Sequence, residues 1–148
     1  MFYKEMSTIT VEEFFRLFEQ ANSDFDVQLI SMLYADVFMF ANPQGVQTVK
    51  KEDFVKVLPR RKELMRAAGL LSSRVDSVAV TKLDSKYILV KAVWNMRVRA
   101  HNEVEVAGNT SATYILSMVG DSLEIVFQVD HQDLAKTVQQ LRGNSDHS

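Results

Sequence analysis

The chain has 148 residues, of which 47% are hydrophobic and 24% charged, and its formal net charge is −2. This length supports one domain with a hydrophobic core, and the composition is that of a folded protein rather than a disordered one. The slight negative charge provides no global attraction to DNA or RNA, and the absence of cysteine excludes disulfides and thiol chemistry.

The two ends of the chain bound the expected domain. Residues 1–6 are interrupted by Glu5 and do not resemble a secretory leader. No window approaches the roughly 18–20 apolar residues of a membrane span. We therefore expect a cytoplasmic protein that contacts neither a membrane nor nucleic acid. A single domain is predicted over residues 1–142, and the short polar segment 143–148 is predicted to be a disordered tail.

Two amphipathic helices are predicted at the start of the domain. Thr10 and Glu13 have the spacing of a capping box. Apolar residues then repeat at helical spacing, which predicts a helix over residues 11–21. The polar run 22–24 ends it, and a second helix is predicted to begin near Asp26. The side chains expected to face inward from that second helix are Leu29, Ile30, Met32 and Leu33.

A short strand, a turn and a third helix are predicted next. Residues 37–41 are rich in residues that favour strands. Pro43 and Gly45 favour a turn over residues 42–45. A helix is predicted over residues 51–68, and Pro59 inside it predicts either a kink or two short helices. Its expected buried side chains are Phe54, Val55, Leu58, Leu64 and Met65.

From about residue 70 the hydrophobic period changes to two, which indicates strands. Residues 87–99 alternate apolar and largely charged side chains, as in an antiparallel sheet with one face in water, and a strand of this length should curve. Further strands are predicted over residues 112–119 and 123–130, the last with an inner row of Ile125, Phe127 and Val129. A final helix is predicted from Asp130 or His131 to about residue 141. Helices segregated from an antiparallel sheet define the α+β class.

This order of elements resembles the nuclear transport factor 2-like superfamily, which includes ketosteroid isomerase, scytalone dehydratase and polyketide cyclases. Three segments carry the resemblance. The first is Leu33-Tyr34-Ala35-Asp36, together with the strand, Pro43 and Gly45 that follow it. The second is Trp94 on a long strand. The third is residues 112–116, which lead through Gly120-Asp121 to residues 123–126. The resemblance implies a cone-shaped domain, a cystatin-like roll, in which a curved mixed or antiparallel sheet wraps the N-terminal helices around an apolar pocket. It also implies a homodimer that forms through the sheet.

The catalytic residues of ketosteroid isomerase are not carried over by this resemblance. The general base of that enzyme corresponds here to Asn42, and an amide cannot take up a proton at neutral pH. Its phenolic donor corresponds to Phe14 and Phe15, which have no hydroxyl. Its protonated aspartic acid corresponds to Thr113 or Tyr114. Asp36 and Tyr114 are the candidate catalytic residues that are left, so the sequence leaves open whether the chain is an enzyme.

The predicted pocket is mainly aromatic and aliphatic. Its candidate ligand-binding residues are Phe14, Phe18, Tyr34, Phe38, Phe40, Asn42, Phe54, Leu58, Trp94, Met96, Tyr114 and Phe127. An alternative exists for each of them, because aromatic side chains also fill ordinary hydrophobic cores. Asn42 either orients a ligand or bonds to the local backbone before Pro43. Asp36 is either catalytic or a partly exposed residue where helix meets strand.

The charged segments favour ordinary roles. Arg60-Arg61-Lys62 and Arg66 form a basic patch that could bind an anionic ligand or RNA, although a solvated face is the preferred interpretation. Asp130-His131-Gln132-Asp133 is better explained by helix capping at Asp130 than by a metal site. No metal and no cofactor are expected.

Two functional hypotheses follow from these residues. The first is a protein that binds a hydrophobic small molecule in an apolar pocket. If it is catalytic, the reaction is that of a cofactor-free isomerase, dehydratase or cyclase. The alternative is a non-catalytic dimeric interaction module with a filled interior.

Overall fold

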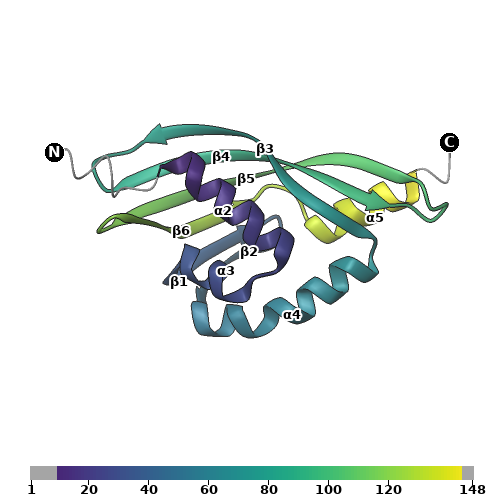
Figure 1. The fold of residues 1–148 in the computed structure, drawn as a ribbon, viewed down its shortest axis with the longest axis horizontal. Helices are drawn as coiled ribbons and strands as arrows, with labels where there is room; N and C mark the ends of the chain where they lie inside the picture. Colours follow the sequence, from purple (N-terminus) through teal and green to yellow (C-terminus); the bar gives the residue numbers. More distant parts are fainter. Residues whose placement is uncertain (1–9, 145–148) are drawn as a thin grey trace.

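A computed structural model describes residues 10–144 and shows an α+β fold, as predicted (Figure 1). Residues 1–9, on which the expectation of no leader depends, lie outside the described part, as do residues 145–148 of the predicted tail. The elements are α2 (Val11–Asp24), α3 (Val27–Leu33), β1 (Tyr34–Asn42), β2 (Gly45–Lys50), α4 (Lys51–Ala67), β3 (Leu70–Lys82), β4 (Tyr87–Arg99), β5 (Glu105–Val119), β6 (Ser122–Asp130) and α5 (Leu134–Asn144).

The strands form one curved, open sheet in the order β2-β1-β6-β5-β4-β3. Only the β1–β6 pair among them is parallel, so the described sheet is mixed. Helix α2 packs on β3, α4 packs on β1, and α5 packs on β5 and β4. Figure 1 shows α5 at the opposite end of the sheet from the β5–β6 hairpin. None of the described helices is long and apolar enough to span a membrane.

The first two helices begin where their capping residues predict. The Thr10 hydroxyl accepts a hydrogen bond from the Glu13 backbone N–H (3.1 Å), and the Glu13 carboxylate accepts one from the Thr10 backbone N–H (3.3 Å). Helix α2 continues to Asp24, beyond the predicted end at residue 21. The Asp26 carboxylate accepts a hydrogen bond from the Leu29 backbone N–H (3.0 Å) and starts α3. Met32 was predicted to face inward, but it is 69% exposed.

Two features between β1 and β3 differ from the sequence prediction. The turn at residues 42–45 leads into β2, which the sequence did not predict. Most β2 side chains are exposed, so this edge strand lacks the alternating apolar pattern of a half-buried strand. Helix α4 runs without a break through Pro59, so two separate helices do not form. Leu64 was predicted to be buried, but it is 59% exposed.

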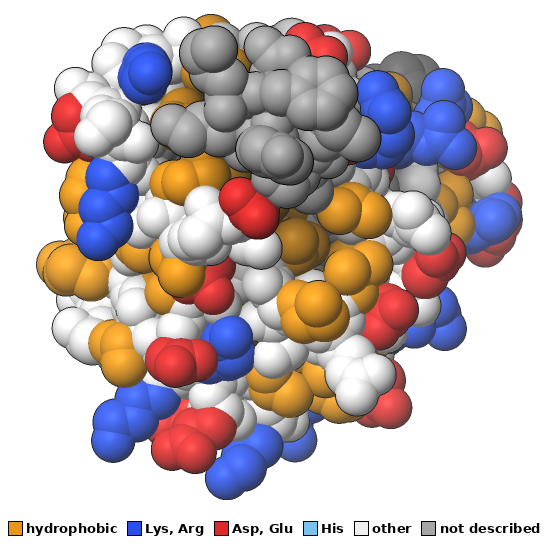
Figure 2. All heavy atoms as spheres, turned by 60° about the vertical axis from the view of Figure 1, so that its left-hand side comes forward, with side chains coloured by type: hydrophobic (Ala, Val, Ile, Leu, Met, Phe, Trp, Pro, Cys, Tyr) orange, Lys and Arg blue, Asp and Glu red, His pale blue; other side chains and the backbone are white. Residues whose placement is uncertain are grey.

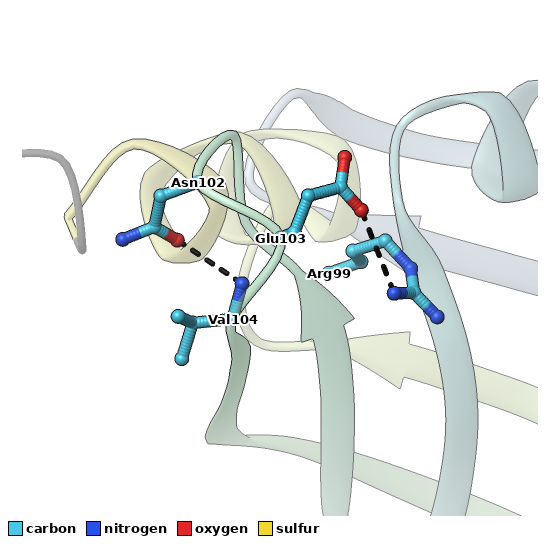
Figure 3. A network of polar contacts seen from close by, with 4 residues as sticks. All are labelled: Arg99, Asn102, Glu103 and Val104. Carbon is cyan, nitrogen blue, oxygen red and sulfur yellow. Dashed lines mark hydrogen bonds and ion pairs between the residues drawn. The ribbon is translucent and has the colours of Figure 1, made fainter.

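The β4–β5 connection and the last helix also differ from the prediction. Strand β5 begins at Glu105, so β4 pairs with β5 along the full length of β4. In the connecting loop the side-chain oxygen of Asn102 (Oδ1) accepts a hydrogen bond from the Val104 backbone N–H, and Arg99 forms an ion pair with Glu103 (Figure 3). Helix α5 begins at Leu134 rather than at Asp130 or His131. It continues through the first two residues of the segment that was predicted to be a tail.

Strand β6 contains a β-bulge at Val126. Ile125 pairs with Leu116, whereas Phe127 pairs with Ile115, so β6 has one more residue than β5 at this point. A one-residue insertion exchanges the two faces of a strand beyond it. Ile125 is fully buried, as predicted. The prediction is wrong for Phe127 and Val129, because beyond the bulge Gln128 and Asp130 share the inner face, opposite Tyr114 and Ala112 respectively.

Candidate functional site

A cavity of about 600 Å³ lies between the inner face of the sheet and helices α2, α3 and α4. Its aromatic and aliphatic lining includes Phe18, Ile30, Tyr34, Phe38, Phe40, Phe54, Leu58, Met65, Trp94, Met96, Ala112 and Tyr114. A second, smaller cavity of about 340 Å³ shares six lining residues with the first, and these residues lie where the two cavities adjoin. They are Phe40, Arg61, Met65, Asp130, Gln132 and Leu134.

The structure brings together most of the residues that the sequence assigned to a pocket. Those that line the larger cavity are Phe18, Tyr34, Phe38, Phe40, Phe54, Leu58, Trp94, Met96 and Tyr114. Phe14 and Phe127 do not line either cavity. Phe14 is fully buried within the hydrophobic core. The bulge at Val126 turns Phe127 away from the inner face.

The two polar candidates on β1 lie outside the larger cavity. The Asn42 side-chain oxygen accepts a hydrogen bond from the Gln44 backbone N–H (2.9 Å), which is the local turn role, and Asn42 lines the smaller cavity. The Asp36 carboxylate is 99% exposed and forms an ion pair with Lys51 (3.4 Å). Asp36 therefore does not meet a molecule inside either cavity.

Edge-to-face ring contacts hold the aromatic wall in place. The ring of Phe18 lies 5.6 Å from Trp94, 5.8 Å from Tyr114 and 5.9 Å from Tyr34 between centroids. Phe54 lies 4.9 Å from Tyr34, so the wall continues onto α4. Such contacts favour fixed ring orientations in addition to the burial of apolar area. The cavity thus has an ordered aromatic surface.

Tyr114 is a hydrogen-bond donor held in this wall. Its hydroxyl oxygen accepts a hydrogen bond from Trp94 Nε1 (3.0 Å), and no described residue accepts the hydroxyl proton. Burial, and then the nearby Tyr34 and Asp130, raise the pKa of Tyr114. The phenol therefore stays protonated at neutral pH. Tyr114 can donate that proton in a hydrogen bond to an oxygen of a bound molecule.

A series of hydrogen bonds also leads from Tyr34 to the carboxyl group of Asp130, which was predicted to cap a helix. The Tyr34 hydroxyl donates to Gln128 Oε1 (2.6 Å), and Gln128 Nε2 donates to Asp130 Oδ1 (3.0 Å). Burial raises the pKa of Asp130, and the Gln128 hydrogen bond, Arg61 and His131 partly offset that rise. Asp130 is partly buried and lines both cavities, so it is the carboxyl group best placed to exchange a proton there.

Asp130 was predicted to cap the last helix, but the structure gives that role to Asp133. The Asp133 carboxylate accepts from the Lys136 backbone N–H (3.1 Å) at the start of α5. The i, i+2 spacing of Gln128 and Asp130 indicates that they share one face of the strand, but it does not reveal that this is the inner face. Among residues 10–144, no His, Cys, Asp and Glu side chains cluster as metal ligands would.

Comparison with known proteins agrees with this architecture. A family model described as "NTF2-like protein (DUF6841)" matches residues 4–133. Aln2 from Streptomyces has a TM-score of 0.67 and 13% identity, with 86% of this chain and 90% of that chain covered. An NTF2-like protein with a cystatin-like fold from Novosphingobium aromaticivorans has a TM-score of 0.65 and 12% identity, with 87% and 88% covered.

A ketosteroid isomerase-like protein from Erwinia carotovora atroseptica is similar in the same way. Its TM-score is 0.64 at 11% identity, and the match covers 82% of this chain and 92% of that one. At such low identity these similarities establish the fold and not the chemistry. No curated protein matches the sequence.

Proposed function

This chain belongs to the NTF2-like family designated DUF6841, and on that premise we propose that its cavity binds a mainly apolar small molecule. The observation that carries the proposal is an ordered aromatic wall that contains one free hydroxyl donor, Tyr114. The volume of about 600 Å³ lies within the range of small-molecule sites, which combine apolar walls with a few polar anchors. An oxygen of the ligand would accept the hydrogen bond from Tyr114.

Asp130 supports a second candidate function, proton transfer on the bound molecule. Its raised pKa makes the carboxylate a stronger base than a solvated one, and Gln128 and Tyr34 fix its orientation. A cofactor-free isomerase, dehydratase or cyclase needs such a base near its substrate. Asp130 on β6 would be that base, because the amide of Asn42 cannot take up a proton and Asp36 lies outside the cavities.

We also propose that the protein is a homodimer formed through its sheet. The bulge turns Phe127 to the outer face, beside Met39 of β1 and Ile115 of β5, and Ile115 pairs in turn with Leu89 of β4. These four apolar residues form a row across four strands. Figure 2, turned toward the left-hand side of Figure 1, shows hydrophobic side chains exposed in patches between charged ones. A second copy of the chain, packed on the row of Met39, Phe127, Ile115 and Leu89, would cover these four side chains.

Native mass spectrometry and titration with N-phenyl-1-naphthylamine, a neutral fluorescent probe, test these proposals. We expect the probe to bind in a saturable manner and the main species to be a dimer. An interaction module with a filled interior would bind no probe, and that result would contradict the binding proposal. If sedimentation shows only a monomer at high protein concentration, the dimer proposal is contradicted and the ligand-binding proposal still stands.

A further inference from the structure

We infer that the ligand of the larger cavity is an organic anion, with an apolar body inside the cavity and its negative group held by basic side chains of α4. This inference rests on the proposed binding function and names the chemical class of the ligand. The geometry that carries it is a row of cations on the same helix face that contributes apolar residues to the cavity wall.

The charge of the cavity lining is opposite in sign to that of the whole protein. The chain has 17 Lys and Arg residues against 19 Asp and Glu residues. The charged residues that line the larger cavity are Lys50, Arg61, Lys62 and Arg66, against Asp53 and Asp130. An electropositive lining in an acidic protein raises the local concentration of anions and favours their binding.

The spacing of these cations places them beside the apolar wall. Leu58, Arg61, Lys62, Met65 and Arg66 all line the cavity, and their spacing of i, i+3, i+4, i+7 and i+8 defines one face of a helix. Leu58 is buried, whereas Arg61 and Arg66 are exposed. The face therefore changes from apolar inside the cavity to cationic at its rim, which matches a molecule with an apolar body and one charged end.

Two of these cations form no ion pair and no side-chain hydrogen bond with a described residue, although Arg61 acts on Asp130 at longer range. The ion pairs found in residues 10–144 are Lys51–Asp36 and Arg99–Glu103, and neither involves the cavity. Arg61 and Arg66 donate no side-chain hydrogen bond to a described residue, and Arg61 lies beyond ion-pair distance of Asp130. Lys62 already lies over the ring of Phe25, 4.5 Å from its centroid. The two guanidinium groups are therefore free to bind an anionic oxygen, for which their planar geometry is suited.

A pair of matched probes tests the inference. 1-Anilinonaphthalene-8-sulfonate has the same aromatic body as N-phenyl-1-naphthylamine and differs from it by one sulfonate group. We expect the sulfonate to bind about ten-fold more tightly than the neutral probe, because each charge-assisted contact adds to the affinity. Raising the salt concentration from about 0.05 M to about 0.5 M should weaken the binding of the sulfonate probe and not that of the neutral probe, because salt screens charge.

The double variant Arg61→Gln with Arg66→Gln locates the contact. It should weaken sulfonate binding about ten-fold and leave the neutral probe unchanged, because only the charge contacts are removed. Lys91→Gln with Arg97→Gln removes two exposed cations of β4 that do not line the cavity, and it serves as the matched control. Equal affinity of the wild type for both probes, or equal losses in both double variants, would overturn the inference and leave the binding proposal intact. Failure of both probes to bind would overturn the binding proposal as well.

Discussion

Replacing Ala112 with leucine tests directly whether the interior is hollow. Ala112 lies on the inner face of β5, is 4% exposed and lines the larger cavity. Ala92 lies directly opposite on β4, is 1% exposed, and does not line the cavity. The two alanines share a face and a strand pair, so Ala92→Leu is a matched control for the same change in side-chain volume.

The expected effects have opposite signs. Leucine adds three carbon atoms, and burial of each contributes about 0.8 kcal/mol, so filling the cavity can raise the free energy of unfolding by up to about 2 kcal/mol. At Ala92 the same atoms meet packed neighbours, and overpacking typically lowers the free energy of unfolding by about 1–3 kcal/mol. Ala112→Leu should therefore be neutral or stabilising, and Ala92→Leu destabilising.

Urea unfolding followed by the fluorescence of the one tryptophan, Trp94, measures both free energies. Titration with N-phenyl-1-naphthylamine should also show weaker binding to Ala112→Leu and unchanged binding to Ala92→Leu. A loss of stability at Ala112 as large as that at Ala92 would refute the reasoning. The inner face of β5 would then be packed and not open.

Two further predictions concern the polar groups of the cavity. Burial raises the pKa of Asp130 in the folded protein. The protonated side chain therefore makes its full contribution to stability below the unfolded pKa of about 3.9. That contribution is lost as the pH rises through the pKa of the folded protein. Asp130→Asn should therefore have a higher Tm than the wild type at pH 7 and the same Tm near pH 3. A difference in Tm that does not change with pH would contradict this. Tyr114→Phe leaves Trp94 Nε1 without its acceptor and should lower the free energy of unfolding in urea by about 1–3 kcal/mol, whereas Tyr87→Phe, with no hydroxyl bond to a described residue, should have no effect. Equal effects of the two tyrosine changes would contradict the role of Tyr114.

Local patterns were sufficient to predict most elements of the fold. The capping residues Thr10 and Asp26 located two helix starts, and strict alternation located β4 with its inner face. Strand β2 was missed because it is an exposed edge strand, and such strands carry no alternating signal. Met32 and Leu64 were placed wrongly because apolar residues on a helix also occur on its exposed face.

The apolar part of the candidate site followed from the sequence, whereas its polar part did not. Aromatic residues such as Phe18, Phe54 and Trp94 line the cavity because their strand or helix face points inward. The position of Asp130 depends on the register between β5 and β6. A single inserted residue changes that register, and no periodicity within β6 reveals it, because apolar residues occupy both faces near the bulge.

The bulge at Val126 affects both faces of the sheet. On the inner face it places Gln128 and Asp130 opposite Tyr114 and Ala112 respectively, so the cavity acquires the carboxyl group of Asp130. On the outer face it places Phe127 beside Met39 and Ile115, which completes the apolar row. A β6 strand without the bulge would turn Phe127 inward, where its ring would occupy cavity space, and would turn Asp130 toward the outer face. The proposed ligand site and the proposed dimer surface therefore depend on one feature of the backbone.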